Sequence, residues 1–82
     1  MGWIYPIFVY DSSMNILFSE RLVQLRKEKG LSQVELAKVL NTTQRRISYM
    51  ELGKVEPDLS TLVALSTYFE VSTDYLMGIK DY

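Results

Sequence analysis

The stretch LSQVELAKVLNTTQRRISYMELG, residues 31–53, decides the fold of this 82-residue chain. It predicts two short helices joined by a tight turn. Ser32 and Glu35 have the spacing of a capping box, in which each side chain accepts a hydrogen bond from a backbone N–H at a helix start. The first helix should therefore begin directly after Ser32 and end near Leu40, and Asn41 should then turn the chain.

The second helix of this stretch separates its polar side chains from its apolar ones. Thr43 is predicted to cap the helix, and Gly53, just past Leu52, is predicted to stop it. At 3.6 residues per turn, Ile47 and Met50 share one face. The other face carries four polar side chains, those of Gln44, Arg45, Ser48 and Tyr49. A helix that buries one side and offers amide, guanidinium and phenol groups on the other suits the major groove of DNA.

The rest of the chain predicts three more helices from its apolar periodicity and its stop signals. They are expected at about residues 19–29, from residue 58 or 59 to residue 69, and over a short segment capped at residue 72 or 73 that ends at Gly78. The expected core consists of Phe18, Leu22, Leu25, Leu36, Leu40, Ile47, Leu62, Leu65 and Phe69.

Residues 1–13 differ in composition from the remainder and are treated as an N-terminal arm, with a DNA-binding domain at residues 14–82. The aromatic and β-branched run from residue 3 to residue 10 favours a strand, and residues 11–13 favour a turn. Pro6 confines such a strand to the edge of a sheet. Three interpretations stay open: pairing with the same strand of a second copy, packing on its own domain, or a start-site artefact.

Composition narrows the class of protein. Hydrophobic residues make up 48% of the chain, which fits one globular domain and argues against disorder. The sequence has neither Cys nor His, which excludes disulfides, the usual metal sites and histidine-based catalysis. Its longest uncharged apolar run, eight residues, is too short for a membrane span of about 20 and makes a poor signal peptide. We therefore expect a cytoplasmic protein with no cofactor, no membrane partner and no evident small-molecule substrate.

The charge is unevenly distributed along the chain, although the net charge is only −1. Residues 21–54 hold eight basic and three acidic residues, whereas the remainder holds one basic and seven acidic residues. The basic charge thus gathers around the two-helix stretch, as expected where phosphates are contacted. An acidic remainder should weaken non-specific DNA binding and leave more of the discrimination to contacts with bases.

Four pieces of the sequence, in order, resemble one family. They are RLVQLRKEKGLSQVELA at residues 21–37, TTQRRISYMELGK at residues 42–54, Pro57, and VSTDYLMG at residues 71–78. Together they resemble the phage-repressor and Cro type of helix-turn-helix transcriptional regulator, which is lambda-repressor-like and belongs to the xenobiotic-response-element family. The resemblance covers residues 18–78. It implies an all-α, five-helix lambda-repressor-like DNA-binding domain, to which this chain adds its strand-like N-terminal arm.

The resemblance also implies roles in DNA contact. Gln44 and Arg45 match the first two base-reading positions of the recognition helix, and Tyr49 matches a third. Gln33 matches a glutamine that grips a backbone phosphate, and Lys54 lies in a loop that contacts phosphate in relatives. The complete set of expected DNA-binding residues is Gln33, Thr43, Gln44, Arg45, Arg46, Ser48, Tyr49 and Lys54.

Further positions match features that shape the domain. Arg26 and Glu51 match a salt bridge between the first and third helices, and Ala37 matches a small residue that lets two helices approach closely. Asn41 replaces the usual glycine of the turn, and Asn also adopts the left-handed conformation. Arg46 lies at the edge of the groove-facing side, so either a phosphate contact or a solvated side chain is expected for it.

These observations predict a sequence-specific, double-stranded-DNA-binding transcriptional regulator. We expect it to be a repressor that binds a pseudo-palindromic operator as a homodimer. The alternative is an antitoxin or protein-interaction module whose N-terminal arm binds a protein partner by strand addition. An enzyme is not expected, because the chain lacks Cys and His and has no carboxylate pair at a recognisable catalytic spacing.

Overall fold

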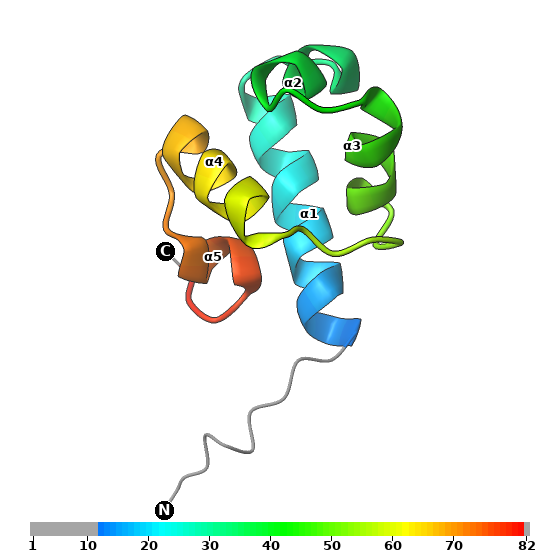
Figure 1. Ribbon diagram of the computed structural model, residues 1–82. Coiled ribbons are helices and arrows are strands. Elements are labelled where there is room, and N and C mark those ends of the chain that lie inside the picture. Colours follow the sequence, from blue (N-terminus) through cyan, green and yellow to red (C-terminus); the bar gives the residue numbers. More distant parts are fainter. Residues whose placement is uncertain (1–11, 82) are drawn as a thin grey trace, which may run out of the picture.

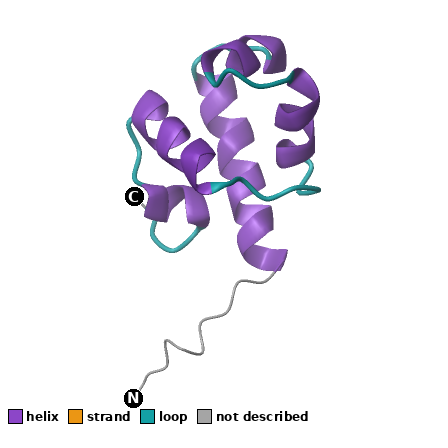
Figure 2. Cartoon of the chain, viewed as in Figure 1, coloured by secondary structure: helices purple, strands orange, loops and turns teal. Residues whose placement is uncertain are grey.

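The computed structural model describes residues 12–81, which form five helices and no strand (Figures 1 and 2). The helices are α1 (Ser12–Glu28), α2 (Gln33–Val39), α3 (Gln44–Glu51), α4 (Leu59–Phe69) and α5 (Thr73–Met77). The predicted all-α, five-helix class is therefore confirmed. The predicted strand at residues 3–10 lies outside the described residues. Within residues 12–81 no helix combines the length and apolar character needed to cross a membrane.

Helix α1 runs through the middle of the domain, and the other helices pack around it. In the view of Figure 1, α3 lies on one side of α1, and α4 and α5 lie on the other. α2 packs against α3, α1 contacts both α3 and α5, and α4 packs on α5. α2 and α3 thus form a two-helix unit mounted on α1, so the position of α3 is set by contacts with both neighbours.

Each helix contributes apolar side chains to one core. Six of them, Leu22, Leu36, Ile47, Met50, Leu65 and Leu76, are completely buried, and burying each such side chain stabilises the fold by about 1.5–3 kcal/mol. Leu40 and Leu62, which were expected in the core, are half-buried and pack against it. The buried hydroxyl of Ser19 donates a hydrogen bond of 2.7 Å to the backbone oxygen of Met50, which joins α1 to α3.

The starts of α2, α3 and α5 follow the predicted caps. Ser32 Oγ accepts from the backbone N–H of Glu35 at 3.0 Å, and the Glu35 carboxylate accepts from the Ser32 N–H at 2.8 Å, which confirms the capping box. The Ser32 N–H holds the pKa of Glu35 below its ordinary value. Thr43, Asp58 and Ser72 cap α3, α4 and α5 in the same way, each accepting from the N–H three residues later.

The helix ends also follow local signals. Asn41 has a φ of 56°, so it turns the chain in the left-handed conformation that was expected of it. Gly53 has a φ of 75°, and the hydrogen bonds from Gly53 N to Met50 O and from Lys54 N to Tyr49 O complete a Schellman motif. This motif sends the chain back past the end of α3 and brings Lys54 beside Tyr49.

The predicted start of the first helix was wrong. α1 begins at Ser12, seven positions before the expected residue 19, so Ser12 and Ser13 are helical and not part of a turn. Among the described side chains of α1, burial begins at Phe18 and Ile16 is 53% exposed, so the apolar stripe that predicted the helix gave no signal for its first turns. No Gly or Pro occurs between residue 12 and Gly30 to interrupt the helix.

Candidate nucleic-acid interface

The outer flank of α3 is polar and open to solvent. Gln44 and Arg45 are exposed, whereas Ser48 and Tyr49 are half-buried. On the opposite flank Ile47 and Met50 are completely buried, and the hydrogen bond from the Arg46 N–H to Thr43 Oγ1, 3.1 Å long, fixes where the helix begins. The polar flank therefore belongs to a helix whose rotation about its own axis is fixed by the core.

Tyr49 contacts two cationic side chains on this flank. Its hydroxyl accepts hydrogen bonds from Nε and Nη2 of Arg45, at 3.3 and 3.1 Å. The Arg45 guanidinium lies 5.3 Å from the ring centroid, and the Lys54 ammonium lies 5.6 Å from it. Both distances are within the range of cation–π attraction. The ring thus holds two positive groups together at the surface, where an anionic partner would meet them.

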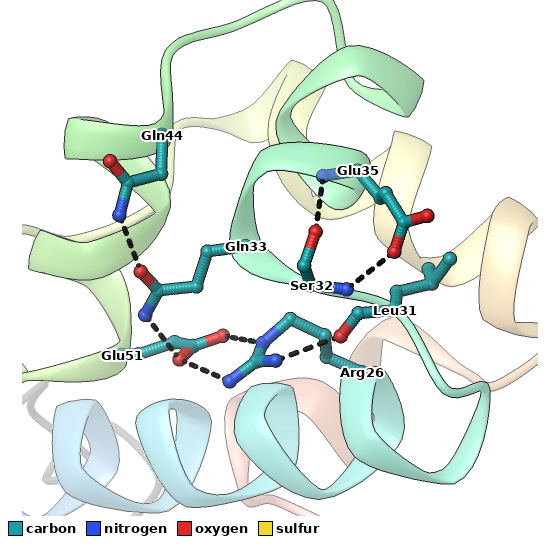
Figure 3. Close-up of polar contacts among 7 residues, drawn as sticks. All are labelled: Arg26, Leu31, Ser32, Gln33, Glu35, Gln44 and Glu51. Atoms are coloured by element: carbon teal, nitrogen blue, oxygen red, sulfur yellow. Dashed lines mark hydrogen bonds and ion pairs between the residues drawn. The ribbon is translucent and has the colours of Figure 1, made fainter.

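A second group of polar side chains links the interior to the surface through Arg26, Glu51, Gln33 and Gln44 (Figure 3). Arg26 donates to Glu51 Oε2 through Nε at 2.5 Å and to Oε1 through Nη2 at 3.0 Å. Gln33 Nε2 donates to the same Oε1 at 2.9 Å, and Gln33 Oε1 accepts from Gln44 Nε2 at 2.7 Å. We call these four residues the polar chain.

The inner end of the polar chain is shielded from water. The side chains of Arg26 and Glu51 are 12% and 6% exposed, and the hydrogen bond to Glu51 raises the pKa of Arg26. Arg26 also donates to the backbone oxygen of Leu31, 2.9 Å away. The predicted salt bridge between the first and third helices is therefore present, and it also ties in the segment that leads to α2.

Residues 22–76, more than half of the chain, match the family model described as Helix-turn-helix. The chain belongs to the helix-turn-helix family. Its α2 and α3, with the turn between them, are the two helices from which the family takes its name. This membership agrees with the helix-turn-helix resemblance that the sequence motifs indicated.

Curated relatives in this family are named as regulators of transcription. Over 61 residues the chain is 46% identical to the SPbeta prophage-derived uncharacterized HTH-type transcriptional regulator YonR of Bacillus subtilis (strain 168), a match covering 74% of this chain and 56% of that protein. It is 41% identical over 59 residues to the HTH-type transcriptional regulator ImmR of the same organism, covering 72% of this chain and 46% of ImmR. The chain spans about half the length of the curated relatives it matches.

Solved helix-turn-helix structures have the same arrangement. The P22 c2 repressor, in a crystal structure with a synthetic operator, superposes with a TM-score of 0.73 and 33% identity, covering 78% of this chain and 97% of that one. The restriction-modification controller protein C.AhdI from Aeromonas hydrophila superposes with a TM-score of 0.70 and 28% identity, with the same coverage.

Within this helix-turn-helix unit, the expected DNA-binding residues fall into two groups. The polar chain brings Gln33 to Gln44, and the aromatic ring of Tyr49 brings together Arg45 and Lys54. Two further expected residues, Thr43 and Ser48, belong to neither group. Arg46 turns instead toward the start of α4, where its Nη2 lies 3.8 Å from a carboxylate oxygen of Asp58 in a solvent-exposed ion pair.

Sequence reasoning did not include Val55 among the site residues. Val55 is half-buried in the loop after α3 and helps to line a hollow of about 220 Å³ together with Thr43, Arg45, Arg46 and Tyr49. An apolar residue in a loop carries no chemical signal of its own, so only the fold places it here. The link between Gln33 and Glu51 was also missed, because these residues lie 18 positions apart in sequence.

Proposed function

We propose that this chain binds double-stranded DNA in a sequence-specific manner and regulates transcription. The observation that carries the proposal is the polar flank of α3, which faces solvent on a helix whose opposite flank is fully buried. A helix of this kind, placed in the major groove, reads base edges with the side chains of its outer flank. The likeness to the P22 c2 repressor, solved with a synthetic operator, supports the same use here.

The side chains of the flank suggest which bases they would contact. The amide of Gln44 matches the donor and acceptor edge of adenine, and the guanidinium of Arg45 matches the two acceptors of guanine. Arg45 gives Tyr49 only part of its five N–H donors, so the rest stay available to guanine while the Tyr49 contact persists. Gln33, Arg46 and Lys54 would hold the backbone phosphates, and Thr43, Ser48 and Tyr49 would line the groove around them.

The proposed binding unit is a homodimer on a pseudo-palindromic operator, with half-sites about one helical turn, 34–36 Å, apart. Exposed apolar residues on α4 support self-association: Leu59 and Val63, one turn apart, are 76% and 52% exposed. Val63→Lys should therefore weaken dimerisation, whereas Val39→Lys, at a 44% exposed valine of α2, should not. Sedimentation over a range of protein concentrations would measure both, and equal dimerisation constants would contradict this interface.

Occupancy of the operator is the simplest mode of regulation for such a domain, because a protein bound there prevents other proteins from binding the same DNA. We therefore propose repression. The chain is also 40% identical over 61 residues to the HTH-type transcriptional activator BcrR of Enterococcus faecalis, in a match covering 74% of this chain and 30% of BcrR. A reporter gene carrying the selected operator would distinguish the two directions: expression should fall when the protein is supplied.

Selection of duplexes from a random pool tests the function itself. The protein should enrich a short motif with inverted half-sites, and Arg45→Ala should relax the preference at one base pair per half-site, by about 1–3 kcal/mol. Lys54→Ala is the matched comparison, because loss of a phosphate contact should weaken all sequences alike and reduce the dependence of affinity on salt. Failure to enrich any motif, or equal losses on selected and scrambled duplexes for Arg45→Ala, would contradict the proposal.

A further inference from the structure

Near its inner end the polar chain contains a group that cannot donate a hydrogen bond, the Glu51 carboxylate, and this has consequences for the outer end of the chain. Glu51 is 6% exposed and accepts from Arg26 through both carboxylate oxygens. We propose that Glu51 is a positioning residue for base specificity: through Gln33 it orients the amide of Gln44 so that Gln44 reads adenine and not guanine. This inference rests on the proposed function, because it requires Gln44 to meet a base.

The first step follows from the chemistry of the carboxylate. An ionised carboxylate has acceptors only, whereas a glutamine amide has an oxygen that accepts and a nitrogen that donates. Gln33 must therefore turn its Nε2 toward Glu51, as it does at 2.9 Å from Oε1. The opposite orientation would place two acceptor oxygens against each other in a part-buried site, which costs free energy because the oxygens repel and the Gln33 oxygen would have no donor.

The second step concerns the hydrogen bond by which Gln33 fixes the orientation of the exposed Gln44 amide. With Nε2 of Gln33 turned inward to Glu51, its Oε1 is the atom left to face Gln44. An oxygen acceptor selects a donor, so Gln44 presents its own Nε2, at 2.7 Å. The orientation of an exposed amide is thus determined by a buried carboxylate two hydrogen bonds away.

The third step concerns what Gln44 then offers to the groove. One N–H of its Nε2 is used by Gln33, so its outward pattern is one remaining N–H donor and the Oε1 acceptor. Adenine presents the N7 acceptor and the N6 amino donor in the major groove, which match this pattern, whereas guanine presents two acceptors, N7 and O6. If the amide were reversed, two N–H donors would face the groove and guanine would match instead.

The contacts of Arg26 hold the Glu51 carboxylate in place, so the orientation of the two glutamine amides is maintained. Arg26 engages both oxygens of Glu51 and also the backbone oxygen of Leu31, so the carboxylate is held on a part-buried guanidinium that is itself anchored. Rotation of the carboxylate would break the ion pair away from water, where the unpaired charges are costly. Glu51 therefore acts as a fixed acceptor and not as one of several alternatives.

A change of donor pattern at residue 33 tests the inference directly. A lysine ammonium has donors only, so in Gln33→Lys it should donate to Glu51 and also to Gln44, which must then turn Oε1 inward and two N–H groups outward. The preference at the base pair read by Gln44, identified by its loss in Gln44→Ala, should change from adenine to guanine. We expect the adenine-to-guanine affinity ratio, measured by fluorescence anisotropy on duplexes selected by the wild-type protein, to fall at least tenfold and to invert.

Three further variants distinguish an effect of amide orientation from an effect of added charge and from loss of the fold. Gln33→Met offers no polar atom and should bring the adenine-to-guanine ratio close to one. The double variant Arg26→Met, Glu51→Leu should do the same while remaining helical by circular dichroism. Gln24→Lys adds the same charge at an exposed glutamine of α1 and should leave the ratio unchanged. Retention of the adenine preference in Gln33→Lys and Gln33→Met, or a wild-type preference for guanine at this pair, would overturn the inference.

The orientation can also be followed without DNA, which separates failure of the inference from failure of the proposed function. Side-chain ¹⁵N relaxation of Gln44 should show a restricted amide in the wild-type protein and a mobile one in Gln33→Met. Equal mobility in the two proteins would overturn the inference even if the wild-type protein binds DNA. A restricted amide in a protein that binds no duplex would instead refute the proposed function alone.

Discussion

The ion pair between Arg26 and Glu51 gives a quantitative prediction about stability. Arg26→Met removes the guanidinium and leaves the Glu51 carboxylate, 6% exposed, with a hydrogen bond from Gln33 as its remaining contact within the polar chain. Removing one partner of a buried pair costs about 3–5 kcal/mol, because the other charge stays buried without compensation. Small domains are stable by about 5–15 kcal/mol, so this single change would consume a large fraction of the total.

The double variant Arg26→Met, Glu51→Leu is predicted to be more stable than Arg26→Met. Both charges are then gone, and the groups that lose a partner are the Leu31 carbonyl and the Gln33 amide, at about 1–3 kcal/mol for each buried group left unsatisfied. Apolar replacements of a buried pair are often neutral or stabilising, which offsets part of that loss. We expect the second substitution to recover about 2 kcal/mol.

Urea unfolding followed by far-ultraviolet circular dichroism measures these differences. With a slope of about 1–3 kcal/mol per M, the midpoint for Arg26→Met should fall by about 1 M or more. Arg46→Met is the control, because its pair with Asp58 is solvent-exposed and such pairs contribute about 0–1 kcal/mol. The reasoning is refuted if Arg26→Met loses no more stability than Arg46→Met, or if the double variant is the less stable of the two.

Two further predictions concern a turn and an acid-sensitive cap. Gly78→Ala should destabilise the fold by about 1–3 kcal/mol more than Gly30→Ala, since both positions have a positive φ but only at Gly78 would the new Cβ lie 2.8 Å from Leu17 Cδ1; equal melting temperatures would contradict this. The lowered pKa of Glu35 means that its contribution to stability is complete above the ordinary value of 4.5 and is lost as pH falls through the folded-state pKa. Between about pH 5 and about pH 2, Glu35→Gln should therefore reduce the pH dependence of the free energy of unfolding more than Glu20→Gln does. Identical pH profiles of the two variants would show that the cap contributes nothing.

The ends of α2 and α3 were predictable because their determinants are local. Ser32 and Glu35 satisfy each other's backbone N–H groups within one turn, and Thr43 does the same for α3. Asn41 adopts its left-handed φ of 56° for a reason contained in its own side chain. Such features depend on residues a few positions apart, so a single sequence is enough to place them.

Features that depend on packing between distant segments were harder to predict from the sequence. The early start of α1 was missed because the apolar stripe that predicted this helix begins only at Phe18, after its first turns. The salt bridge of Arg26 and Glu51 was expected from the family resemblance, and its geometry confirms it. The contact of Gln33 with Glu51 and the position of Val55 beside Tyr49 depend on how α2, α3 and the following loop meet, which no local rule gives. The roles of the polar flank in contacting DNA remain predictions.

The hydrogen bond between Gln33 and Gln44 also has a thermodynamic consequence for association. A flexible side chain that becomes immobilised on binding loses conformational entropy worth about 0.5–1.5 kcal/mol. Both glutamines are already held in the domain alone, so most of that loss occurs during folding and not in the proposed binding to DNA. For two such residues the saving is about 1–3 kcal/mol, which corresponds to roughly a five- to 150-fold gain in affinity over the same residues left free to rotate.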